Sequence, residues 1–261
     1  MKKERTQIQK LNALLRQARI PKWFHHYGPK KYTSWQHLKC LFLKEELGLS
    51  YRRLMPVLAY FGIRNSPDRT TLIKFSKRLR QKFKNLLLLW SAKVKNCAVG
   101  AIDGTGISRT NASPHYVLRI GRKIKKKDHI KLSIYVDVKT KKILSARVRS
   151  KQRHDVLDVK YLVENAPIIA ETTLMDKGYD SKNIHKFFRE QGKFSIAPTR
   201  KGCRRNMYRK QLRDCFDYGQ YWQRNIVEAV IGAVKRKYGS SVSARTDNSQ
   251  KTQIYLRMIL H

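Results

Sequence analysis

The sequence predicts an α/β fold, a mixed sheet flanked by helices, preceded by a helical region. Residues 1–95 carry helix-start signals and turn residues, whereas short apolar runs typical of strands begin near residue 97. These runs first follow one another and then alternate with helical stretches, and a long apolar helix comes last. We therefore expect two domains, a helical region over residues 1–95 and an α/β domain over residues 96–261.

Three helices are expected within the second half of the N-terminal region. Ser34 is expected to cap the first, which runs to Leu47, and the second contains Pro56, which shortens or kinks a helix. The third is expected over residues 68–89 and carries many basic side chains. Three short helices with a basic last helix are typical of a helix-turn-helix-like DNA-binding module, but also of trihelical arrangements that contact no DNA.

The second region predicts a hairpin and then alternating helices and strands. Asp137 is expected to start the hairpin turn, and Asp155 to cap the helix that follows. A short terminal helix near residues 252–260 would either close the core or form a dimer contact. The strands are expected at residues 98–102, 131–137, 143–148, 172–175 and 194–197, with a further candidate short strand at 117–120, and the helices at 155–165, 181–191 and 221–235.

The charge of the chain points to a polyanionic partner. There are 58 Lys and Arg against 18 Asp and Glu, which gives a formal net charge of +40. Residues 1–95 hold 23 basic and 4 acidic residues, which leaves 35 and 14 for the rest, so both regions are basic. Self-repulsion on this scale favours a nucleic-acid partner. A ribosomal-type binding protein and the general basicity of some proteomes are alternative explanations of the same charge.

No membrane or secretory segment is expected from the sequence. The first residues lead into no apolar stretch, and the longest apolar run, residues 86–90, is far shorter than a membrane span. Cys40, Cys97, Cys203 and Cys215 form no CxxC pair, which argues against a zinc site and for a reducing compartment. We expect a cytoplasmic, nucleoid-associated protein.

One helix near the C-terminus places four functional residue types on one face. With Tyr221 set to zero and a turn of about 100° per residue, Arg224 lies near about −60°, Glu228 near about −20° and Lys235 near about −40°. An acid flanked by two cations and an aromatic residue, on the polar side of an apolar helix, is typical of a site that holds a metal ion and a phosphate.

Two more acids stand at the ends of apolar strands. Asp103 and Asp176 follow such strands directly, and sites in open α/β sheets form beyond the carboxyl ends of strands. Together with Glu228 they predict an oxygen-only site, which selects Mg²⁺ or Mn²⁺. Two such ions promote phosphoryl transfer. Asp103 in an Asp-Gly pair is alternatively a turn residue, and Asp180 is either a functional acid beside Asp176 or a helix cap.

These motifs resemble those of a known enzyme family. Residues 221–235 match the spacing Tyr-(2)-Arg-(3)-Glu-(6)-Lys, and the segments AIDGTGI (101–107) and TLMDKGYDS (173–181) resemble the first and second acid motifs that accompany it. The chain resembles, over about residues 98–245, the DDE transposases of bacterial or archaeal insertion sequences that carry this signature.

The resemblance implies a ribonuclease-H-like catalytic domain in which Asp103, Asp176 and Glu228 bind two Mg²⁺ or Mn²⁺ ions. It implies that Arg224 and Lys235 contact phosphates at the transposon end, and that Tyr221 packs against or hydrogen-bonds the DNA terminus. The implied reaction is cleavage at the element ends followed by strand transfer. The implied partner is double-stranded DNA, both element ends and target, bound by a homodimer in the synaptic complex.

Two connecting segments add basic residues. Only 52 positions separate Asp176 from Glu228, so the large β-rich insertion of some members cannot fit, and residues 200–210 are expected as a basic loop facing DNA or disordered without it. The loop after Gly121 is expected either to contact phosphates or to be merely solvated. Its candidate DNA-binding residues are Arg122, Lys123, Lys125, Lys126 and Lys127.

Three other functions share some of these features. A nuclease or recombinase of the same fold would use the same acids without strand transfer. A catalytically inactive or domesticated DNA-binding protein would keep the fold and the charge. A basic structural protein that binds RNA or DNA would not need three acids placed in this way.

Overall fold

The computed structural model divides into two compact units that interleave along the sequence. It describes residues 2–24, 27, 30–63, 65–109, 118–119, 121, 129–151, 153–200, 207–214 and 216–261. Unit 1 comprises Met1–Ser91 and Ala244–His261, and unit 2 comprises Ala92–Ser243. None of the helices in these described stretches is both long enough and apolar enough to cross a membrane.

Unit 1 is helical, as the sequence predicts. Thr33, rather than Ser34, caps α2 through a capping box with Gln36. The helix that contains Pro56 is short and continues into a 3-10 turn. The helices of unit 1 are α1 (Lys2–Gln17), α2 (Ser34–Glu46), α3 (Tyr51–Val57), α4 (Arg69–Arg78), α5 (Gln81–Ala92) and α12 (Asp247–Leu260).

The single basic helix predicted over residues 68–89 is wrong, because the chain breaks it into α4 and α5. Leu79 has an extended backbone (φ −61°, ψ 115°). The carbonyl groups of Lys77 and Leu79 are bound instead by the side-chain amide of Asn248, at 2.6 and 3.1 Å. The break is therefore stabilised by a residue of α12 that lies far away in the sequence.

The C-terminal helix groups with unit 1, whereas we expected residues 96–261 to form one α/β domain. α12 packs against α2 and α4, and almost all of its side chains are buried. Its Arg257 Nε lies 3.0 Å from Glu45 Oε2 of α2. This burial makes α12 part of the core of unit 1.

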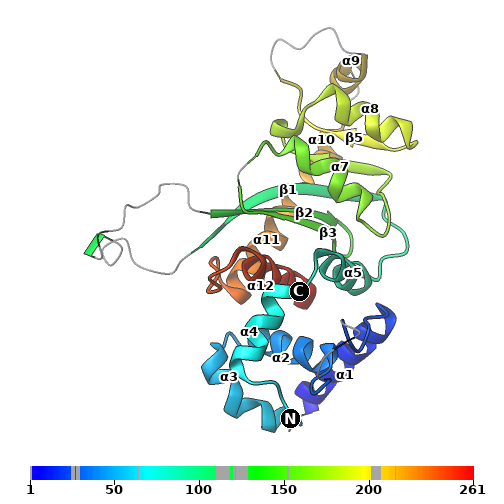
Figure 1. Ribbon diagram of the computed structural model, residues 1–261. Coiled ribbons are helices and arrows are strands. Elements are labelled where there is room, and N and C mark those ends of the chain that lie inside the picture. The colour runs from blue at the N-terminus through cyan, green and yellow to red at the C-terminus, as the bar shows by residue number, and fades with distance from the viewer. Residues whose placement is uncertain are drawn as a thin grey trace. The chain divides into compact units, whose positions relative to one another are not determined.

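Unit 2 is built on a five-stranded mixed sheet in the order β3-β2-β1-β4-β5. β1, β2 and β3 are antiparallel, whereas β1, β4 and β5 are parallel. Figure 1 shows α7 and α8 on one side of the sheet and α11 on the other. This arrangement confirms the predicted ribonuclease-H-like mixed sheet flanked by helices. The strands are β1 (Val99–Ser108), β2 (His129–Asp137), β3 (Ile143–Arg149), β4 (Thr172–Met175) and β5 (Phe194–Ile196).

The remaining helices of unit 2 follow the predicted alternation. The basic segment expected as a loop becomes helical at Met207, and residues 201–206 of it lie outside the described residues. As predicted, Asp137 forms the hairpin turn and accepts a hydrogen bond from Thr140 N at 3.1 Å. The helices are α7 (Val156–Glu164), α8 (Lys182–Glu190), α9 (Met207–Asp214), α10 (Tyr218–Trp222) and α11 (Asn225–Tyr238).

A tyrosine fixes β4 beside β1. Tyr135 of β2 is buried, and its hydroxyl receives a hydrogen bond from Ala170 N (2.9 Å) and lies 3.1 Å from Thr173 Oγ1. Its ring passes over Gly100, where a Cβ atom would stand only 2.5 Å from the ring. A glycine in β1 therefore lets Tyr135 reach β4 and set its position.

Candidate active site

The pairing of β1 with β4 brings two of the predicted acids together. The parallel register ends with Ile102 opposite Met175, so Asp103 and Asp176 come next on neighbouring strands. Neighbouring strands lie about 4.8 Å apart. β1 itself continues to Ser108 while paired with β2, so Asp103 neither ends a strand, as predicted, nor forms a turn. The strand that ends at this point is β4, and its end exposes the edge of β1.

The two aspartates point to the same face of the sheet. Side chains alternate along a strand, and Ile102 and Met175 belong to the hydrophobic core beneath α7 and α8. Asp103 and Asp176 therefore point to the opposite face, where α11 lies. Asp103 Oδ1 accepts a hydrogen bond from Gly104 N, and Asp176 Oδ1 accepts one from Lys177 N, both at 2.7 Å. In each case the next backbone amide orients the carboxylate.

Glu228 is presented to this face by α11. Val227, Val230, Val234 and Tyr238 form the buried side of the helix, which packs on β1 and β2. The side chain of Glu228 is 51% exposed on the polar side. We call Asp103, Asp176 and Glu228 the acid cluster. Burial is the main cause that raises the pKa of Asp103, and the negative charges of Glu228 and Asp176 raise it further, so the three acids influence one another electrostatically.

The prediction that one helix carries all four signature residues is wrong for Tyr221. Tyr221 lies in the short helix α10, a turn follows, and Arg224 is the N-cap residue of α11. Only Glu228 and Lys235 lie inside α11. Tyr221 still lies close enough to the acids for their charges to act on its phenol. Burial raises the pKa of Tyr221, Arg224 lowers it, and the negative charges of Asp176 and Glu228 raise it further. The turn thus keeps Tyr221 at the site.

Arg224 is the internal counterion of the acid cluster. Its guanidinium lies 2.7 Å from Glu228 Oε1 and 3.9 Å from Asp103 Oδ2. Although burial lowers the pKa of Arg224, the charge and hydrogen bond of Glu228 together with the charges of Tyr221 and Asp103 outweigh it, and the pKa is raised overall. Arg224 therefore stays protonated and holds a positive charge between two of the three acids.

Lys235 of α11 contacts β1 farther along the strand than Asp103. Its Nζ donates a hydrogen bond to Thr105 Oγ1 at 2.6 Å. Thr105 lies on the same side of β1 as Asp103, two residues or about 7 Å away. Sequence reasoning did not identify Thr105, although the period-two alternation from Asp103 would have pointed to it. A lysine ammonium is thus positioned beside the acid cluster on the exposed part of β1.

The donor set suits a divalent cation, but a ready-made metal centre is not formed. Three carboxylates are the ligands that Mg²⁺ and Mn²⁺ prefer. Within the described part of the chain, however, no three His, Cys, Asp or Glu side chains gather closely enough to hold a metal ion. The cation that Asp103 and Glu228 share here is Arg224, so a metal ion would compete with its guanidinium.

Asp155 does not cap a helix, contrary to prediction. It makes no side-chain capping hydrogen bond, and its carboxylate instead forms an ion pair with Lys131 of β2. Asp158, fully buried on α7, contacts Lys131 at 3.4 Å, accepts a hydrogen bond from Ser133 at 2.9 Å and pairs with Arg149. These buried charges are paired, as burial requires, and they fasten α7 to β2 and β3.

Asp180 has a role that neither of our alternatives described. It is buried, lies 3.3 Å from His185 Nε2, and accepts hydrogen bonds from Arg200 N (2.9 Å) and Arg209 Nε (2.8 Å). His185 Nδ1 in turn lies 2.7 Å from Ser195 Oγ of β5. Burial raises the pKa of Asp180, but these hydrogen bonds lower it overall. Asp180 thus anchors α9 close to the strand end that bears Asp176.

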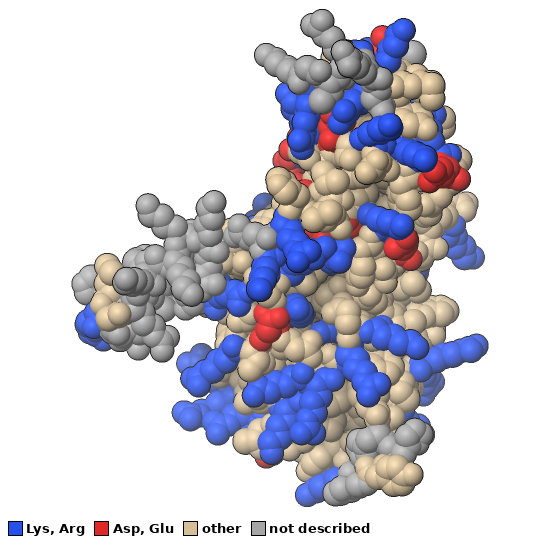
Figure 2. Space-filling model, turned by 45° about the horizontal axis from the view of Figure 1, so that its top comes forward, with Lys and Arg blue, Asp and Glu red and all other residues tan. Residues whose placement is uncertain are grey.

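The five basic residues predicted in the loop after Gly121 lie outside the described residues. Elsewhere, Figure 2 shows Lys and Arg spread over the face drawn, with few Asp and Glu among them. On this face, therefore, the basic residues are not confined to one segment.

Three comparisons with known proteins bear on this site. A family model described as "Transposase DDE domain" matches residues 98–261. No curated protein sequence matches the chain. Among solved structures, a piggyBac transposase synaptic complex with hairpin DNA is similar at a TM-score of 0.52 and 12% identity, covering 97% of this chain and 70% of that one. This similarity supports the fold alone.

A Drosophila P element transposase strand transfer complex matches at a TM-score of 0.35 and 12% identity, over 96% of this chain and 70% of that one. A score this low supports no argument about the fold.

Proposed function

Since residues 98–261 match its model, the chain belongs to the Transposase DDE domain family, and from that premise we propose that it is a DNA transposase of a prokaryotic insertion sequence. It would cleave the ends of the element and join them to target DNA. The observation that carries this proposal is the β1–β4 register, which sets Asp103 beside Asp176 on the face that α11 covers with Glu228. The Tyr-(2)-Arg-(3)-Glu-(6)-Lys spacing supports the assignment to an insertion-sequence group.

Each residue of the site has a proposed role. Asp103, Asp176 and Glu228 would hold one or two Mg²⁺ or Mn²⁺ ions, which activate a water or hydroxyl and stabilise the leaving oxygen. The amides of Gly104 and Lys177 keep the two aspartates oriented for this task. The remaining roles belong to cations and to the aromatic residue of the signature.

Arg224 would exchange its carboxylate partners for a phosphate at the element end. Lys235 would add a second phosphate contact beside Thr105, and Tyr221 would pack against the DNA terminus. The carboxylates and a phosphate are interchangeable partners for a guanidinium, because both accept paired N–H hydrogen bonds. The arginine that neutralises the acids in the resting protein would thus become available when metal and DNA arrive.

We further propose double-stranded DNA as the partner, bound by a homodimer that brings two element ends together. The net charge of +40 supports this partner. The loop residues Arg122, Lys123, Lys125, Lys126 and Lys127 would contribute phosphate contacts without sequence preference.

The decisive experiment is incubation of the full chain with DNA that carries the flanks of its own gene, with Mg²⁺ and with a chelator. We expect cleavage at the element ends and joining to a target plasmid, both lost on chelation. Cleavage without joined products would instead indicate a nuclease of the same fold.

A second candidate is an inactive DNA-binding protein that keeps the fold. The pairing of Arg224 with Asp103 and Glu228 favours it, because these acids already have a counterion. Tight binding of the end-bearing DNA with no cleavage in Mg²⁺ or Mn²⁺ would support this candidate over the transposase.

A further inference from the structure

A cavity of about 660 Å³ lies wholly within unit 1 and is lined by aromatic and basic side chains. From its lining we propose that it binds an unpaired nucleotide of DNA, with the base against the aromatic rings and the phosphate on the surrounding cations. A cavity of this volume is within the range of small-ligand sites, about 300–1,000 Å³. The proposal assumes that DNA is the partner, but not that the acid cluster cleaves it.

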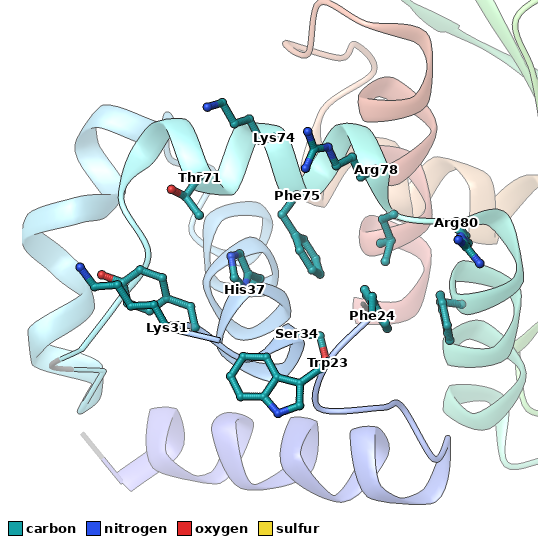
Figure 3. Close-up of a pocket in the computed structure, with 13 residues that line it drawn as sticks. Trp23, Phe24, Lys31, Ser34, His37, Thr71, Lys74, Phe75, Arg78 and Arg80 are labelled. Carbon is teal, nitrogen blue, oxygen red and sulfur yellow. The ribbon is translucent and has the colours of Figure 1, made fainter. Parts of the chain in front are cut away.

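Four nearly parallel rings form a stack along the cavity. Phe24 stacks on Phe83 with centroids 4.4 Å apart and on Phe75 at 5.7 Å, and Phe75 stacks on His37 at 4.4 Å. Their interplanar angles are 15–19°. Figure 3 shows Phe75, His37 and Phe24 pointing into the same space from α4, α2 and the segment before α2. Phe24 and Phe75 each stack on two rings, so a base can extend this stack only at its ends, on His37 or Phe83. Stacking of this kind works for every base, because each has a π face.

The stack is not simply the interior of unit 1. Phe24, Phe75 and Phe83 are only partly buried, as are Trp23 and Tyr32, which also line the cavity. A separate hydrophobic cluster that contains Leu54 and Leu72 joins α2, α3 and α4. The two ends of the stack, and the rings of Trp23 and Tyr32 that lie outside it, are thus the surfaces that a base would contact.

The cations around the cavity suit a phosphate. Lys31, Lys74, Arg78 and Arg80 line it, and all four are exposed. Among its described lining residues there is no Asp or Glu. Lysine and arginine supply the phosphate contacts that dominate DNA binding. The combination of ring faces with unopposed positive charge matches one nucleotide better than an apolar ligand.

His37 adds a hydrogen-bond acceptor beside the rings. Its Nδ1 lies 2.7 Å from the carbonyl oxygen of Thr33, which can only accept, so Nδ1 carries the proton. Burial lowers the pKa of His37, which keeps the ring neutral and leaves Nε2 as an acceptor. An amino or imino group of a base is a suitable donor to it.

The cavity wall is fixed before any ligand arrives. The indole of Trp35 donates to Ile20 O at 2.8 Å, and Ser34 N donates to Lys22 O at 2.8 Å. These bonds attach the segment that bears Trp23 and Phe24 to the start of α2. A preformed site loses less conformational entropy on binding.

The test compares two duplexes that differ by one base. One carries a single extrahelical thymine, and the other carries an abasic residue at the same position, so the phosphates are identical. Binding of the full chain is measured by fluorescence anisotropy in EDTA, where no cleavage can occur. We expect the duplex with the extrahelical base to bind about tenfold more tightly, because stacking one base contributes on the order of 1–3 kcal/mol.

Variants then place the effect in the cavity. Trp23→Leu and Phe75→Leu should bring the ratio of the two affinities close to one. The matched control is Lys77→Gln on α4, because Lys77 is exposed and does not line the cavity. It should weaken both duplexes equally and leave the ratio unchanged. Asp103→Asn should also leave the ratio unchanged, which separates this inference from the proposed reaction.

A photocrosslink covers the case in which an aromatic variant fails to fold. With 5-iodouracil at the extrahelical position, the wild-type chain should be crosslinked at Trp23 or Tyr32. Equal affinities for the two duplexes, or crosslinks confined to unit 2, would overturn the inference.

Discussion

The cavity of unit 1 and the acid cluster of unit 2 both gather cations, but they use them differently. In unit 2, Arg224 lies 2.7 Å from Glu228 and is largely neutralised by it. In unit 1, four exposed cations surround the cavity and no acid is among its described lining residues. The difference teaches that net charge does not show which cations are available to DNA. A cation beside a carboxylate must first lose that partner, whereas the cations at the cavity can bind a phosphate directly.

The largest expected effect separates the two sites by activity. Asp103→Asn should reduce DNA cleavage by about 10³-fold or more, because a lost metal ligand removes several kcal/mol of transition-state stabilisation. Cleavage of end-bearing DNA in Mg²⁺ measures this. DNA affinity in EDTA should change little, since Asp103 is proposed to hold metal ions and not to contact DNA itself.

Glu164→Gln is the matched control for the acid cluster. Glu164 is an exposed helical glutamate of unit 2, and its Oε1 lies 3.8 Å from Lys160 Nζ, which is a long distance for an ion pair. Its replacement should leave cleavage near the wild-type rate. A comparable loss in both variants would mean that negative charge in general, and not the acid cluster, supports the reaction.

The second effect concerns the stability of unit 1. Asn248→Ala should lower its free energy of unfolding by about 1–3 kcal/mol, because the carbonyls of Lys77 and Leu79 lose their donor. The amide oxygen of Asn248 also accepts a hydrogen bond from the buried Lys84 at 2.7 Å. Hydrogen exchange of amides in α4 and α5 would report the loss. Unchanged protection there would show that the break between the helices is stable without Asn248.

The third effect is a pH dependence confined to unit 1. Burial, and after it the charge of Lys251, lower the pKa of Lys84 from 10.5 to about 8. Between these values the unfolded chain binds more protons than the folded chain, so the free energy of unfolding should rise with pH, by roughly 1–3 kcal/mol. Chemical denaturation at pH 8 and pH 10 measures the rise. Lys84→Met should flatten it, and a curve identical to wild type would exclude Lys84 as its cause.

The smallest effect tests the availability of the cations themselves. Lys74→Gln and Arg78→Gln should each reduce the slope of log affinity against log salt by about 0.9, as expected for one phosphate contact. In EDTA, Arg224→Gln should reduce this slope less, because Glu228 already neutralises Arg224. Equal changes in all three variants would remove the distinction between the two regions.

The sequence predicted the sheet well because its signals are local. Alternating or continuous apolar runs located all five strands, and two acids after apolar runs identified neighbouring strand positions. The candidate strand at residues 117–120 is wrong, because residues 118 and 119, the two of them that the structure describes, are helical. The burial of one side of α11 likewise followed from its apolar pattern. The features that set the site thus depend mainly on residues close together in the chain.

What the sequence did not predict depends on distant partners. The break between α4 and α5 is stabilised by Asn248 of α12. The carboxylate of Asp155 pairs with Lys131 of β2 instead of capping α7. The turn after Tyr221 breaks a helical spacing that is itself regular. The cavity joins aromatic residues from four separate segments, so no short stretch of sequence reveals it.

Because α12 is part of unit 1, the place where the chain is cut matters for preparing fragments of the protein. The family match begins at residue 98 and runs to residue 261, so it includes α12 but none of the helices that cover it. A fragment cut at the start of that match would expose Ile254, Leu256 and Met258, which are at most 3% exposed in the intact chain. We expect such a fragment to aggregate. Residues 92–243 form the better excisable piece, and a peptide linker from Ser91 to Ala244 would make unit 1 a continuous chain.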